Sequence, residues 1–245
     1  MRRAIAIILG VIAIAACACS GGSSASKTTA TTAATVSDAV FKTAATAAAN
    51  SAQITQADLP AGWTGAPHRA DDTKLDLSPA CAAFNDVDPW KSAIANVHSP
   101  DLTDAEHREV NSQAVAYRTA DLANTDSSAA SALLTNCGDE IGRALEASIV
   151  ADAPGTTAHV TFTPLDSSNL EGWTAGYKLS VSAASATGAT TYAASGGWLW
   201  KVSGRMIAAF EYSGGETTPV DASMVTTLKA LIAKRLAAAD ATLPN

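Results

Sequence analysis

The chain has no cluster of basic residues and no apolar segment long enough to cross a membrane as a helix. Its 245 residues include 16 Lys and Arg against 23 Asp and Glu, which gives a formal net charge of −7. An acidic chain without a basic patch argues against nucleic acid as a partner. The apolar run from residue 4 to residue 16 is shorter than the roughly 20 residues that a membrane-spanning helix needs.

The sequence also lacks the motifs of the common catalytic and cofactor sites. It contains no G-x-S-x-G nucleophile elbow, no H-E-x-x-H zinc motif and no glycine-rich phosphate loop. The four histidines, His68, His98, His107 and His159, are scattered, and we interpret the acidic residues around His98 and His107 as a solvated loop. We therefore predict no catalytic residue, no metal site and no cofactor.

The N-terminus has the pattern of a bacterial lipoprotein signal. Two arginines precede the apolar run, which ends in the lipobox-like segment Ile14-Ala15-Ala16-Cys17. We predict that residues 1–16 are a signal peptide and that Cys17 is acylated. Cys19 is the alternative, because its acylation would leave an even pair of cysteines, and an ordinary secreted protein is a third. Loss of the two arginines would move the net charge from −7 to −9.

An acylated cysteine at this place predicts how the protein meets the membrane. A lipobox cysteine normally receives a diacylglycerol, and two acyl chains anchor a protein more firmly than the marginal binding that one chain provides. The predicted location is the outer face of the cytoplasmic membrane.

Composition divides the rest of the chain in two. Residues 17–53 consist mostly of Ser, Thr, Ala and Gly, whose small side chains bury too little apolar area to offset the entropy of ordering. We predict a tether there, in which residues 36–49 could form a frayed helix. Residues 54–245 suit one folded extracytoplasmic domain.

Within the domain, strand patterns outnumber helix patterns. The clearest strand pair has a Ser203-Gly204 turn, with Trp198, Trp200 and Val202 on one face of its first arm. Helix patterns lie at residues 125–145 and 219–239, where Thr125 or Asp126 and Thr218 are the predicted caps, and the other strand patterns lie at residues 110–120, 159–163 and 173–183. Helices segregated from a mostly antiparallel sheet indicate the α+β class.

The two cysteines of the domain are predicted to form a disulfide. Leu133, Cys137, Ile141 and Leu145 recur every four residues, which points Cys137 toward the core of a helix. A bridge to Cys81 is permitted outside the cytoplasm, and two buried free thiols are the alternative.

Tryptophan offers the main candidate for ligand contact. Trp198 and Trp200 could line a groove between the sheet and a helix, because aromatic rings often line such sites. The alternative is that both belong to the core, as most tryptophans do.

Several features together resemble a group of actinobacterial lipid-anchored envelope proteins. They are the lipobox, the Ser/Thr tether, the Asp58–Trp63 and Ser99–Leu102 segments, Cys81, the helix with Cys137, Gly204-Arg205 and the final helix with Arg235. The group is similar to the extracellular sensor domain of a mycobacterial serine/threonine kinase. The resemblance implies an α+β, disulfide-stapled domain that is not an enzyme. It departs in one respect, since the kinase type is expected to have two disulfides.

Anchor, tether and missing catalytic motifs together predict a non-catalytic module that binds or senses an unknown envelope ligand or protein. A structural or assembly factor for envelope proteins is one alternative. An envelope hydrolase with an unrecognised carboxylate site is the other, because sequence cannot give the separation of two carboxyl groups.

Overall fold

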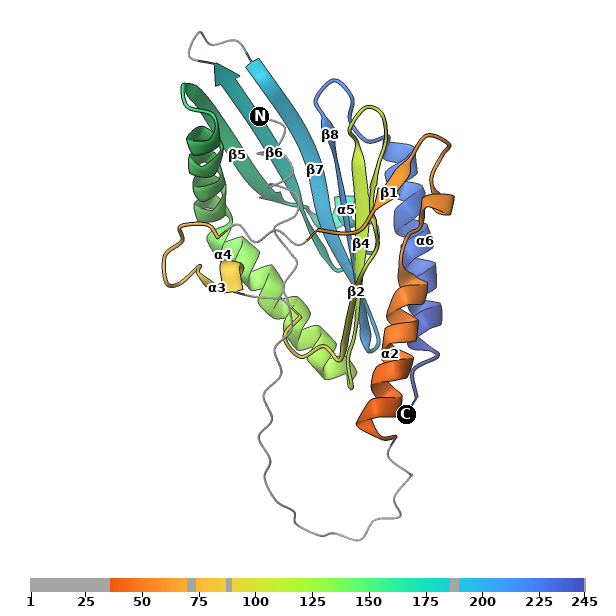
Figure 1. Cartoon of the computed structure of the whole chain (residues 1–245). Helices are drawn as coiled ribbons and strands as arrows, with labels where there is room; N and C mark the ends of the chain where they lie inside the picture. Colours follow the sequence, from red (N-terminus) through yellow and green to blue (C-terminus); the bar gives the residue numbers. More distant parts are fainter. Residues whose placement is uncertain (1–35, 70–73, 87–89, 186–189, 245) are drawn as a thin grey trace.

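One antiparallel sheet of eight strands organises the described part of the chain (Figure 1). The computed structural model describes residues 36–69, 74–86, 90–185 and 190–244. The strands are β1 (Thr64–Ala66), β2 (Ala95–His98), β3 (Asp101–Thr103), β4 (Glu109–Ala116), β5 (Thr156–Pro164), β6 (Ala175–Ser185), β7 (Thr190–Ser203) and β8 (Met206–Gly215). The sheet order is β1-β3-β4-β8-β7-β6-β5, and β2 pairs with β4 beside β3.

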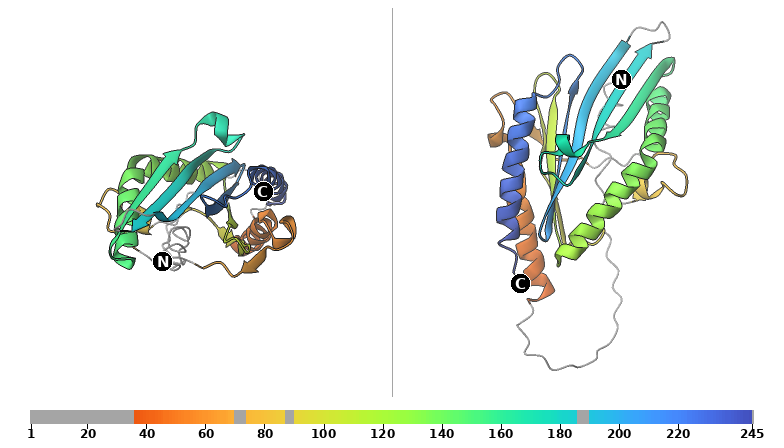
Figure 2. Two further views of the ribbon diagram at one scale, coloured as in Figure 1. Left: turned by 90° about the horizontal axis from the view of Figure 1, so that it is seen from above. Right: turned by 180° about the vertical axis from the view of Figure 1, so that it is seen from behind.

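Helices cover both faces of this sheet (Figures 1 and 2). α2 (Asp38–Ala52) and α6 (Ala222–Asp240) lie side by side on one face, and α4 (Ala120–Asp152) lies on the other; α3 (Ala83–Asp86) and α5 (Ser167–Leu170) are short. Residues of β8 alternate between the two layers, with Phe210 packed in the α2 and α6 layer and Ala209 in the α4 layer. The predicted α+β class, single domain and mostly antiparallel sheet are confirmed.

α2 belongs to the folded domain, where the sequence boundary placed it in the tether. Phe41, Ala45 and Ala49 are at most 1 % exposed and pack against α6, β2 and β4. Alanine side chains allow two helices and a sheet to approach closely, so a segment too poor in apolar area to fold alone is held by its neighbours. Composition shows a shortage of large apolar residues and cannot show which neighbours cover the small ones.

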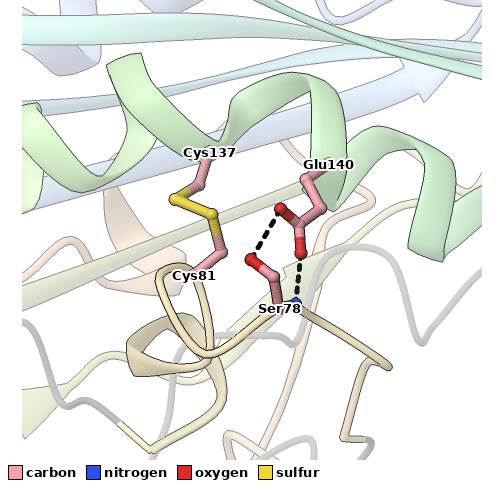
Figure 3. Close-up of a disulfide and its surroundings, with 4 residues drawn as sticks. All are labelled: Ser78, Cys81, Cys137 and Glu140. Atoms are coloured by element: carbon pink, nitrogen blue, oxygen red, sulfur yellow. Dashed lines mark hydrogen bonds between the residues drawn. A yellow bond between two sulfur atoms is a disulfide. The ribbon is translucent and has the colours of Figure 1, made fainter.

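α4 is the element that carries the disulfide. It begins at the N-cap Thr119, whose hydroxyl accepts a hydrogen bond from the Leu122 amide at 3.3 Å, rather than at the predicted caps further along. The predicted Cys81–Cys137 disulfide is present, with 5.7 Å between the Cα atoms (Figure 3). It joins α4 to the loop that contains α3.

A second link reinforces the disulfide. The Ser78 amide and hydroxyl both donate to the carboxylate of Glu140, one turn along α4 from the bridge, and the hydroxyl bond measures 3.0 Å (Figure 3). The irregular segment before β2 is therefore tied to α4 at two neighbouring points.

The β7–β8 hairpin agrees with the sequence prediction, and the start of the last helix does not. Gly204 takes a positive φ of 53° in the tight turn, a conformation that glycine adopts without strain. α6 begins at the N-cap Asp221, whose carboxylate accepts from two backbone amides, rather than at the predicted Thr218. Within the described residues, no helix is both long and apolar enough to span a membrane.

Candidate functional site

Trp200 lies in the core of the α4-facing layer. Its side chain is fully buried, and its indole Nε1–H donates to the Ser127 hydroxyl of α4 at 2.9 Å. The ring stacks on Tyr177 with centroids 5.9 Å apart and meets Trp90 edge-on at 6.4 Å. Trp200 therefore fixes the sheet to α4.

Trp198 lies two residues earlier on the same face of β7, but its exposure and its hydrogen bonding differ from those of Trp200. Its ring centroid is 5.0 Å from that of Trp200, and the side chain is partly exposed. The Nε1 atom itself is buried and has no hydrogen-bond partner among the described residues. A buried N–H donor without an acceptor is uncommon in native proteins, and it often marks a place where a ligand or an ordered water belongs. The predicted ligand role of both tryptophans stays a prediction, and this donor favours Trp198.

Strand register places Trp198 in a row of side chains that crosses four strands. Trp198 on β7 pairs directly with Tyr177 on β6 and with Glu211 on β8, and Glu211 pairs with Asn111 on β4. Residues directly opposite in antiparallel strands present their side chains on the same face. We call these four residues the polar row. At the β4 end of the row, the Asn111 amide donates to the Glu211 carboxyl at 3.3 Å.

Glu211 is the acid of the polar row, and its pKa is strongly perturbed. The pKa of its carboxyl is raised to about 7: loss of hydration is the main cause and the nearby charges of Glu109 and Asp101 add to it, whereas the Asn111 hydrogen bond and His68 oppose the rise. Surrounding protein removes much of the water from this carboxyl, yet the side chain keeps part of its surface accessible. Among the described cations, no Lys or Arg forms an ion pair with Glu211.

Glu109 supplies a second carboxyl on the same face of β4, two residues before Asn111. Burial is the largest cause that raises its pKa, followed by the negative charge of Asp101. His68 and a hydrogen bond from Asn111 act in the opposite direction. Two acids with raised pKa values therefore flank one amide.

Two histidines border the row. The His68 and His98 rings stack with centroids 4.3 Å apart and planes within 1°, and His68 Nδ1 lies 2.6 Å from an Asp101 carboxylate oxygen. The hydrogen bond to Asp101 raises the pKa of His68, whereas burial and the neighbouring His68 lower the pKa of His98 to about 4. The Nε2 atom of His68 is buried and has no partner among the described residues. The carboxylates of Glu109 and Glu211 act on His68 electrostatically, which links the pair to the row.

The geometry offers binding groups rather than a metal centre. In the part of the chain that the structure describes, no three His, Cys, Asp or Glu side chains are grouped closely enough to hold a metal ion. The groups present are an indole donor, two carboxyls of raised pKa, an amide and an imidazole. These groups recognise polar ligands by hydrogen bonds.

A separate pocket of about 450 Å³ lies where the β3–β4 loop meets the start of α6. Its lining includes Trp63, Asp104, Arg108 and Asp221. Asp104 accepts from the Arg108 guanidinium at 2.6 Å, and Asp221 caps α6. Because these charged groups already have partners, the pocket is a weaker candidate than the polar row.

Sequence reasoning found one residue of this site and missed the others. It named Trp198, and it assigned His98 and Asp101 to a solvated loop, whereas the structure places both against His68. It did not single out Glu211, although the alternation in β8 carries a signal. Glu211 shares a face with the core residues Ile207 and Ala209, and an acid at an inward position is unusual. The predicted acylation sites Cys17 and Cys19 lie outside the described residues.

Similarity to known proteins is found among solved structures. No family model matches the chain, and no curated protein does. The chain is similar to the extracellular domain of PknH from Mycobacterium tuberculosis. The match has a TM-score of 0.46 and 15 % sequence identity, and it covers 80 % of this chain and 97 % of that domain. The finding agrees with the resemblance that the sequence motifs suggested.

Proposed function

We propose that the protein is a lipid-anchored extracytoplasmic module of the bacterial cell envelope that binds a ligand at the polar row without catalysing a reaction. The observation that carries the proposal is the buried, unpartnered Nε1–H of Trp198, a residue that pairs with Glu211 across β7 and β8. A bound ligand would supply the missing hydrogen-bond partners.

Two further features support the proposed location outside the cytoplasm at the membrane. The Cys81–Cys137 disulfide fits an oxidising compartment outside the cytoplasm, because cytosolic thiols are normally kept reduced. The lipobox at Cys17 and the small-residue segment up to α2 provide an anchor and a spacer. The membrane is then a partner through the acyl chains, and the acidic domain adds no attraction to an anionic surface.

One observation favours a second candidate, an envelope hydrolase. Glu109 and Glu211 lie close enough to interact, and an acid with a pKa near 7 suits a general acid. A two-carboxylate hydrolase, however, needs one protonated and one ionised group. Such a mechanism also gives no role to the unpartnered indole N–H of Trp198, which a bound ligand would satisfy, so we favour binding over hydrolysis.

A survey of bound molecules tests the proposal. The acylated full-length protein is extracted from its own membrane, and its co-purifying small molecules are identified by native mass spectrometry. Wild type and a Tyr212→Phe control are expected to carry the same molecule, because Tyr212 follows Glu211 on β8 and packs in the opposite layer. The Trp198→Phe variant should lose most of it. Equal occupancy in all three proteins, or turnover of an envelope substrate by the wild type, would overturn the proposal.

A further inference from the structure

Two groups of the polar row and one beside it define what a ligand there must provide. Trp198 Nε1–H requires an acceptor, because no described residue accepts its proton. The Glu211 carboxyl accepts one hydrogen bond within the described part of the chain, from Asn111 at 3.3 Å, and can accept several more. His68 binds Asp101 through Nδ1, which leaves its Nε2 without a partner.

The site requires both a hydrogen-bond acceptor and a hydrogen-bond donor, and a hydroxyl group supplies both. A hydroxyl accepts from the Trp198 indole with its lone pairs and donates its own proton to a carboxyl. An ammonium ion donates only, so it would leave the Trp198 N–H unpaired. A carboxylate or phosphate accepts only, so it has no proton to donate to the Glu211 carboxylate, and the ionised form of that carboxyl would repel it.

Spacing across the sheet extends the argument to more than one hydroxyl. Trp198 and Glu211 are direct cross-strand neighbours, and such neighbours have Cβ atoms about 4.5 to 5.5 Å apart. Adjacent hydroxyls on one ring could reach both side chains. The partly exposed Trp198 ring adds an apolar surface against which the C–H groups of a sugar ring can pack.

We propose that the polar row binds a carbohydrate residue, with ring hydroxyls that accept from Trp198 Nε1–H and donate to the Glu211 carboxyl. The inference rests on the proposed function and names the ligand class for the same site. The sugar can belong to a free oligosaccharide or to the headgroup of a glycolipid, since both present the same hydroxyls.

The test uses defined probes on the full-length acylated protein, held in a polyoxyethylene detergent because sugar-headed detergents would compete. Methyl glycosides of glucose, galactose, mannose and N-acetylglucosamine are titrated by saturation-transfer NMR. Phosphatidylcholine vesicles with and without galactosyldiacylglycerol separate the glycolipid source, and propylammonium chloride probes the cationic alternative. At least one sugar probe is expected to bind.

Variants assign the binding to the row. Trp198→Phe keeps a ring but removes the N–H, and Glu211→Gln removes the charge of the acceptor. Trp198→Phe is expected to weaken the sugar affinity about tenfold or more, because the indole hydrogen bond is lost. Glu211→Gln is expected to weaken the affinity at pH 8, because a neutral amide oxygen replaces the ionised carboxylate as acceptor and accepts a weaker hydrogen bond. Tyr212→Phe should bind as wild type does. Far-UV circular dichroism checks folding, and the Glu211 variant keeps the test decisive should the Trp198 variant unfold.

The outcomes separate this inference from the proposed function. Binding of propylammonium but of no sugar probe would overturn the carbohydrate assignment and leave a binding module. Sugar binding that survives both variants would also overturn it, because the site would lie elsewhere. If no probe binds and the co-purified molecule is not a carbohydrate, the carbohydrate assignment is refuted and the proposed binding function stands.

Discussion

Replacement of Glu211 by glutamine should stabilise the protein at neutral and alkaline pH and leave its stability unchanged in acid. The pKa of the Glu211 carboxyl is raised from 4.5 to about 7 in the folded chain, chiefly by loss of hydration. Between these values the folded protein holds a proton that the unfolded chain has released. The charged carboxyl therefore destabilises the fold as pH rises from about 4.5 to about 7.

The size of the effect follows from the two pKa values. Each unit of difference corresponds to about 1.4 kcal/mol, so full ionisation lowers the free energy of unfolding by roughly 3 kcal/mol. Glutamine stays neutral and retains an oxygen that can accept from Asn111. We expect the free energy of unfolding of Glu211→Gln to match that of wild type near pH 4.5. At pH 8 it should exceed the wild-type value by up to ~3 kcal/mol, which corresponds to about 6 to 12 °C in Tm for a domain of this size.

The assay is urea unfolding followed by far-UV circular dichroism at several pH values between 4.5 and 8, with the disulfide intact. The difference between variant and wild type is used because His98 titrates in the opposite sense. Its pKa is lowered to about 4, so it destabilises the fold as pH falls below 6.5 in both proteins. Tyr212→Phe is the control and should show no pH-dependent difference.

A difference between variant and wild type that does not change with pH would refute the reasoning. So would a Glu211→Gln protein that is less stable than wild type at pH 8. Either result would mean that the ionised carboxyl is well solvated or paired in the folded state, so that Glu211 is not a poorly hydrated acid.

Further predictions concern the staple, the long helix and the anchor. Replacing Cys81 and Cys137 by serine should lower the free energy of unfolding by up to about 4 kcal/mol, as the chain-entropy model gives for their separation of 56 residues, and urea titration of both proteins measures it. Gly138→Ala should raise Tm, because alanine favours a helix by up to about 1 kcal/mol and the new Cβ would meet its nearest atom at 3.6 Å. Gly142→Ala should lower Tm, because its Cβ would lie 2.8 Å from a backbone oxygen of β5, and equal Tm values would contradict this packing. The intact mass of membrane-extracted protein should correspond to a chain that begins at diacylglyceryl-modified Cys17, and an unmodified chain would remove the anchor.

Local patterns in the sequence were sufficient for much of the fold. The Ser203-Gly204 turn between two alternating segments predicts the β7–β8 hairpin, which the structure confirms with both tryptophans facing α4. The four-residue spacing before and after Cys137 likewise predicts its inward direction. Both signals depend on neighbours within one turn or one strand pair, and short-range spacing determines them.

These local patterns do not determine which elements pack against one another. The helix content of α2 could be suggested from its alanines, but its membership of the domain depends on α6 and the sheet covering Ala45 and Ala49. The N-caps of α4 and α6 also differ from the predicted ones, because any nearby Thr or Asp can cap a helix and packing selects among them.

The candidate site shows the same division. The sequence alone determined that Trp198 shares a face with Trp200 on a hairpin arm, because alternation decides which residues share a face of a strand. Only the tertiary structure decided that Glu211 and Asn111 stand beside it and that His68 stacks on His98. Strand register and loop packing bring these residues together across up to a hundred positions of the chain, as between Asn111 and Glu211. Their raised and lowered pKa values follow from that proximity and from the water it removes, neither of which has a counterpart in sequence spacing.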